Sequence, residues 1–125
     1  MVFSPLHWIP STLAALIILS FVITPNRKHH KALGAAAILL ALLGLAGYIS
    51  AGSFRFFPVD LLAFHAWVGF FALALSILLF ADKIFLHAID PGKHCRLGKL
   101  AALLAAVALV VGLLILSGLA PSQTA

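Results

Sequence analysis

Four long apolar runs, separated by short polar connections, take up most of the 125-residue sequence. A helix needs about 20 apolar residues to cross a hydrocarbon core of about 30 Å, and each run reaches that length. Backbone polar groups must pair internally in lipid, and the many Ala and Leu residues favour helices over barrel strands. With 64% hydrophobic and 9% charged residues, the chain is predicted to be an all-α integral membrane protein. The predicted spans are residues 5–24, 29–51, 59–82 and 93–119.

The short connections predict a single domain, residues 1–125, folded as an up-down-up-down four-helix transmembrane bundle. Seven of the eight basic residues lie at the connections after the first and third spans, and only Arg55 lies in the other connection. The positive-inside rule therefore places residues 25–28 and 83–92 in the cytoplasm and both termini on the non-cytoplasmic side. Topology accounts for the net charge of +5, so no nucleic-acid partner is expected.

A histidine stands at or just inside the start of every predicted helix, followed at helical spacing by two small residues. Steps of four and then three residues keep all three on one face of a helix. Close helix packing in lipid explains the small residues but not the histidines, and an ionisable side chain within a span indicates function. The other interpretation is clearance for a flat cofactor held by the histidine. The four stripes are His7, Ser11, Ala14; His30, Gly34, Ala37; His65, Gly69, Ala72; and His94, Gly98, Ala101.

The stripes also indicate an internal repeat and a pairing of the histidines. The second and fourth helices match at a constant offset of 64 residues, so the chain resembles two copies of a helical hairpin. Helices one and three run parallel, which predicts that His7 and His65 lie at the same end of the bundle. His30 and His94, on the two helices that run the opposite way, would then meet at the other end. The stripe selects His30 over its neighbour His29, which points about 100° away around the helix.

Two opposed imidazoles and a slot lined by small residues suit a six-coordinate haem. A metal ion without a macrocycle would need three or four protein ligands at each site, and no carboxylate is consistently placed to supply them. Cys95 is the single cysteine, and no C-x-x-C-H sequence is present, which predicts two b-type haems. The candidate partners for haem carboxylates are Arg27, Lys28, Lys31, Lys93, Arg96 and Lys99.

The sequence FHAWVG, residues 64–69, is similar to a histidine-containing signature of the cytochrome b561 family. Paired ligands on alternate helices also resemble the four-helix dihaem core of that family. The resemblance implies axial ligation of iron by His7 with His65 and by His30 with His94. It does not extend to an ascorbate donor, because no ascorbate site is recognisable.

The expected function is transmembrane electron transfer, by the chain alone or as a subunit of a membrane oxidoreductase. The sequence contains no acid-base pair, no phosphate-binding loop and no flavin or nicotinamide fingerprint, so no catalytic residue is proposed. The expected redox partner is a quinone or another protein subunit, which would deliver or accept the electrons. A larger membrane complex or a homo-oligomer is compatible with so small a chain. The alternative is a chlorophyll-binding or structural small subunit of a membrane redox or photosynthetic complex. A third possibility is a transporter or assembly subunit without a cofactor.

Overall fold

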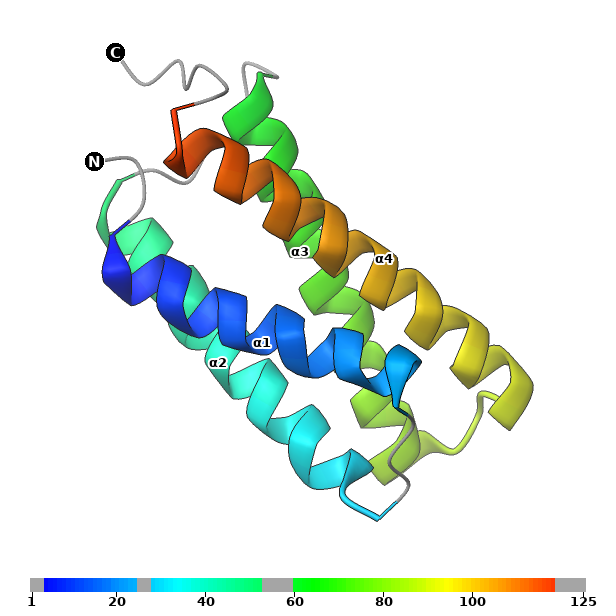
Figure 1. Cartoon of the computed structure of the whole chain (residues 1–125). Helices are drawn as coiled ribbons and strands as arrows, with labels where there is room; N and C mark the ends of the chain where they lie inside the picture. Colours follow the sequence, from blue (N-terminus) through cyan, green and yellow to red (C-terminus); the bar gives the residue numbers. More distant parts are fainter. Residues whose placement is uncertain (1–3, 25–27, 53–59, 119–125) are drawn as a thin grey trace.

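The computed structural model describes residues 4–24, 28–52 and 60–118. Its helices are α1 (Pro5–Ile23), α2 (His30–Ser50), α3 (Leu61–Ala81) and α4 (Pro91–Leu116), with a π-helical turn η1 (Asp82–Leu86) directly after α3. Successive helices run in opposite directions (Figure 1). All four α-helices are long and apolar enough to cross a membrane. The prediction of an all-α, multi-pass, four-helix membrane protein is therefore confirmed.

The bundle consists of two helical hairpins that face each other. Helix α1 packs most extensively against α2, and α3 against α4, as Figure 1 shows. Contact between α1 and α4 is weaker, and contact between α2 and α3 is weaker still. Over the described residues, the diagonal pairs α1 with α3 and α2 with α4 make no close backbone contact. The space on the bundle axis is therefore bounded by all four helices.

Large and small side chains are distributed as lipid requires. Many Leu, Ile and Phe side chains are exposed on the outside of the bundle, where they would face lipid tails. Alanine dominates the interior, and one cluster joins Ala15, Ala72 and Ala105 from three different helices. Helix association in lipid depends on close packing and not on a hydrophobic driving force, which favours small residues at the contacts.

The connection between α3 and α4 is more ordered than the predicted loop at residues 83–92. The Asp82 side chain is 2% exposed, and its Oδ1 accepts hydrogen bonds from the backbone amides of Ala88 at 2.8 Å and Ile89 at 3.1 Å. His87 is exposed and follows η1 with a positive φ of 52°. Only residues 87–90 separate η1 from α4, so the prediction of a ten-residue loop is wrong.

Capping explains where α4 begins and ends. Asp90 accepts a hydrogen bond from the Lys93 amide at 2.8 Å, and Pro91 occupies the first turn, where a missing amide hydrogen has no cost. The helix therefore starts two residues before the predicted position 93. It ends at Leu116, and Gly118 has the positive φ, 76°, that commonly terminates helices. The predicted limits at residues 59 and 119 fall outside the described residues.

Candidate bis-histidine sites

The first histidine pair joins α1 to α3 across the bundle axis. The ring centroids of His7 and His65 are 5.9 Å apart, and the ring planes are almost perpendicular at 89°. His7 Nδ1 donates to the carbonyl oxygen of Gly44 at 2.9 Å, and His65 Nδ1 donates to that of Ala108 at 2.9 Å. A carbonyl can only accept, so each Nδ1 carries the proton and each Nε2 carries the lone pair. That is the tautomer in which a histidine held by a backbone carbonyl ligates a metal.

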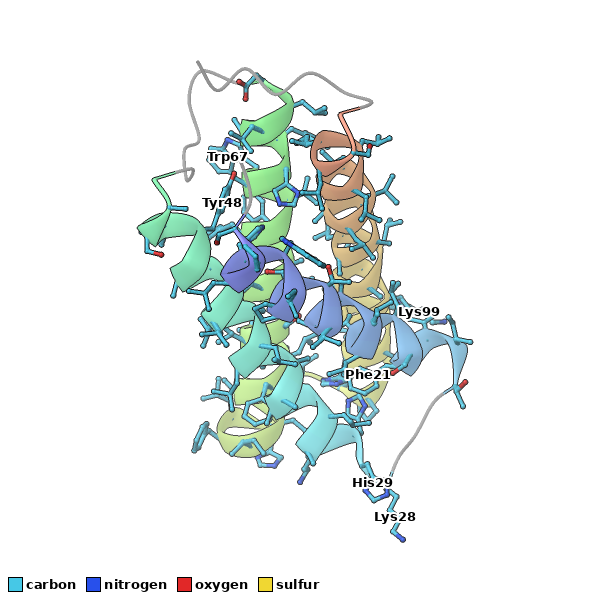
Figure 2. The ribbon with its side chains drawn as sticks, turned by 60° about the vertical axis from the view of Figure 1, so that its left-hand side comes forward. Phe21, Lys28, His29, Tyr48, Trp67 and Lys99 are labelled. Carbon is cyan, nitrogen blue, oxygen red and sulfur yellow. The ribbon has the colours of Figure 1, made fainter. Side chains whose placement is uncertain are left out.

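The second pair joins α2 to α4 at the opposite end of the bundle. The ring centroids of His30 and His94 are 6.2 Å apart, with an angle of 64° between the planes. Phe21 of α1 packs on His30 with a centroid separation of 4.5 Å (Figure 2). Among the described residues, the buried Nδ1 of His94 has no hydrogen-bond partner. His29, which the helical spacing set aside, is exposed and precedes the first turn of α2.

The separation within each pair can be compared with the requirement of axial ligation. Two imidazoles that bind opposite faces of one metal ion, each with a bond of about 2 Å, have centroids about 6 Å apart. The observed separations of 5.9 and 6.2 Å agree with this value. Axial rings can adopt any rotation about the metal-nitrogen bonds, so the angles of 89° and 64° are compatible with it. The two pairs therefore fit the donor set of a bis-histidine haem.

Each histidine pair lines its own cavity. The larger cavity, of about 150 Å³, is lined by all four helices and includes His7, Ser11, His65 and Gly69. The smaller cavity, of about 90 Å³, is also lined by all four helices together with η1. Its lining includes His30, Gly34, His94 and Gly98 together with Lys31 and Lys83.

Two of the stripe glycines face open space and are not helix contacts. A methyl group added at Gly69 or Gly98 would meet no atom within 4 Å, apart from its own local backbone. At Gly34 it would reach only the Phe80 ring, at an ordinary contact distance of 3.9 Å. Since Gly69 and Gly98 also line the cavities, clearance explains them better than close packing does.

Other glycines are true packing contacts. A methyl group at Gly44 would collide with the Ser11 hydroxyl, and one at Gly47 would lie 2.8 Å from the backbone of Leu6. Both positions let α1 approach α2 closely. Ser11 takes the place of a glycine in the first stripe, and its Oγ lies 3.5 Å from His7 Nδ1, too far for a strong hydrogen bond.

The pattern of small residues did not reveal several neighbours of the histidines. The ring of Tyr48, a buried residue, stacks on His7 at 4.6 Å and 26°, and it lies 6.2 Å from His65. A methyl group at Gly112 would lie 2.9 Å from Cε1 of His65, so this glycine makes room for the ring. Lys83 lines the second cavity although it was not a predicted carboxylate partner. The repeat contained one signal, because Tyr48 and Gly112 differ by the same 64 residues as the stripes.

The basic residues predicted to bind the haem carboxylates lie in different surroundings. Only Lys31 among them lines a cavity. Arg27 lies outside the described residues, as does Arg55. The remaining candidates are exposed at the end of the bundle that holds the His30/His94 pair; they are Lys28, Lys93, Arg96 and Lys99.

Metal-ligating groups other than these pairs do not cluster. Within the ranges 4–24, 28–52 and 60–118, no group of three or more His, Cys, Asp or Glu side chains is placed to hold a metal ion. Cys95 is exposed. Each site therefore offers two protein ligands and an apolar cavity. In comparisons with known proteins, no family model, curated protein or solved structure matches the chain.

Proposed function

We propose that this protein is a b-type membrane cytochrome, similar to the cytochrome b561 family, that carries electrons across the bilayer. His7 with His65 and His30 with His94 would each bind the iron of one haem b. The supporting observation is that both pairs meet across the bundle diagonals at 5.9 and 6.2 Å, where the helix backbones do not touch. Haem supplies a one-electron couple and four of the six iron ligands, so two histidines complete each site.

The other residues would orient the ligands and exclude water. The carbonyls of Gly44 and Ala108 fix the rotation of His7 and His65 about their side-chain bonds. Rings held in this way have less rotational freedom to lose, which lowers the entropy lost on binding. Gly69 and Gly98 leave space for a flat macrocycle. The mainly apolar linings limit access of water to the iron.

The position of the two cavities supports electron transfer between them. Ile18, Ala37, Ile38 and Ser76 line both cavities, so the two cavities adjoin and share a layer of side chains. The cavities lie toward opposite ends of helices that are long enough to cross a membrane. An electron would therefore cross the bilayer by one transfer through this layer.

The orientation in the membrane and the partners belong to the same proposal. The described bases gather at the end with His30 and His94, which the positive-inside rule assigns to the cytoplasm. Both termini would then lie on the non-cytoplasmic side. A lipid-soluble quinone or a redox partner subunit would deliver or remove electrons, and the exposed Leu, Ile and Phe side chains would face lipid or another subunit.

A visible spectrum and a haem count of the detergent-purified protein test this proposal. We expect two non-covalent haems per chain, with low-spin bands that sharpen on reduction with dithionite. Pigment bands that do not respond to dithionite would instead establish the chlorophyll-binding alternative. A colourless protein that takes up no haem during reconstitution would contradict both and leave a structural or transport role.

A further inference from the structure

The two histidine pairs stand in different electrostatic surroundings. Lys31 and Lys83 line the cavity of the His30/His94 pair, whereas no described charged residue lines the cavity of the other pair. At the end with His7 and His65, Asp60 is the one charged side chain among the described residues. The opposite end carries six described bases against two carboxylates; the bases are Lys28, Lys31, Lys83, Lys93, Arg96 and Lys99, and the carboxylates are Asp82 and Asp90.

The pairs also differ in the hydrogen bonds made by the imidazoles. Both members of the first pair donate from Nδ1 to a backbone carbonyl at 2.9 Å. Such a bond makes the imidazole a stronger electron donor, which favours the more positive, oxidised state of a bound iron. His94 Nδ1 is buried and lacks a partner of this kind among the described residues.

Both differences act in the same direction. Adding an electron to a site is favoured by nearby positive charge and by weaker ligand donation. The buried Asp82 opposes this trend, but its Oδ1 accepts two backbone amides and the two lining lysines outnumber it.

We therefore propose, on the basis of the function proposed above, that Lys31 and Lys83 make the His30/His94 site the more readily reduced of the two. These lysines are tuning residues, since they act on the potential and not as iron ligands. The consequence is directional: an electron that enters at the His7/His65 site moves toward the basic end. A quinone or partner that donates electrons would then act at the end with His7 and His65. The electron acceptor would act at the basic end, with His30 and His94.

Equilibrium redox titration of single-site variants tests the order of the potentials. His65→Ala leaves the His30/His94 site and His94→Ala leaves the His7/His65 site, so each midpoint is measured alone. We expect the higher midpoint in His65→Ala. Equal midpoints, or the higher one in His94→Ala, would overturn the proposed order while leaving the dihaem function intact. Absence of haem from the parent protein would instead overturn the function, so the two failures are distinguishable.

The role of the lysines is tested in the parent protein with Lys31→Met, Lys83→Met and the double variant. We expect each replacement to lower only the higher midpoint, by about fivefold in the equilibrium constant for reduction, as for one partly screened charge. Lys83→Arg should restore the midpoint, which a purely structural role of Lys83 would not predict. Lys28→Met is the matched control, because Lys28 is exposed, lines neither cavity and points away from the bundle in Figure 2. An unchanged higher midpoint in the double variant, or an equal shift of both midpoints, would contradict the role of the lysines.

Discussion

The two hairpins of this bundle show the same device in two versions. In each hairpin, a histidine near the start of the first helix donates to a carbonyl in the C-terminal half of the second. The accepting residues, Gly44 and Ala108, are 64 positions apart, the offset that relates the second and fourth helices throughout. The repeat therefore preserves a backbone acceptor. Gly44 and Ala108 differ in side chain, but both supply a backbone carbonyl at this position.

The hairpins differ one turn further along the same helices. The ring of Tyr48 in α2 stacks on His7, while the equivalent position in α4 is Gly112, which leaves room for His65. The first histidine is thus held by an aromatic surface and the second by close contact with a helix backbone. The side chains around His7 and His65 therefore differ, whereas the two carbonyl contacts are alike. The two hairpins therefore share the hydrogen bonds of their histidines more than the packing around them.

Removing one ligand from each pair should produce the largest effect and separates the two sites most directly. We expect His65→Ala to lose about half of the bound haem, because a single axial histidine remains at that site. His94→Ala should lose the other half. Haem extraction from purified protein, normalised to chain concentration, measures both.

The control for this experiment is a histidine outside the pairs. His29→Ala and His87→Ala should keep the full haem content, since both residues are exposed and line neither cavity. Retention of all haem by His65→Ala would contradict the pairing. A loss of both haems from a variant that keeps its helix content would show that the two sites are not independent.

An intermediate effect is expected from filling the open space beside one pair. Gly98→Leu should exclude haem from the His30/His94 site, because the leucine side chain would occupy the cavity that Gly98 lines. Gly98→Ala is the matched variant: its methyl group meets no atom within 4 Å, so the helix should gain up to about 1 kcal/mol and the site should survive. The haem count and the thermal unfolding of both variants distinguish these outcomes. A normal haem count in Gly98→Leu would contradict the interpretation that the open space beside Gly98 is clearance for haem.

The sequence predicted the spans, the histidine-headed stripes and the end of the bundle at which each histidine lies. These features depend on hydrophobic length and helical period, both of which can be read along one chain. The sequence could not reveal that the Gly44 carbonyl accepts a hydrogen bond from His7. Every residue has a backbone carbonyl, so the residue type does not show which one is the acceptor. The pattern also treated all small residues alike. Only the packing of the helices distinguishes Gly98, which faces open space, from Gly44, which touches α1.

The prediction of a loop between α3 and α4 was wrong for a related reason. Asp82, the last residue of the predicted span, is buried at the start of a π-helical turn, and its Oδ1 accepts hydrogen bonds from the amides of Ala88 and Ile89 just after that turn. A lone aspartate at the end of an apolar run normally indicates solvated charge. Burial was possible here because backbone amides satisfied it, and such partners are invisible to composition and periodicity.

The smallest change tests the point at which the two hairpins differ. Gly112→Ala places a methyl group 2.9 Å from Cε1 of His65, so the ring or the helix backbone must shift, and we expect this shift to disturb the hydrogen bond from His65 to Ala108. We expect about 1–3 kcal/mol of destabilisation from overpacking and an altered spectrum of the His7/His65 site alone. Low-temperature spectra of Gly112→Ala combined with His94→Ala isolate that site. Gly69→Ala adds a methyl group to the same cavity without a contact within 4 Å and serves as the comparison. If both glycine variants give the parent spectrum, the position of His65 does not depend on the close approach of α4, and the carbonyl alone orients the ring.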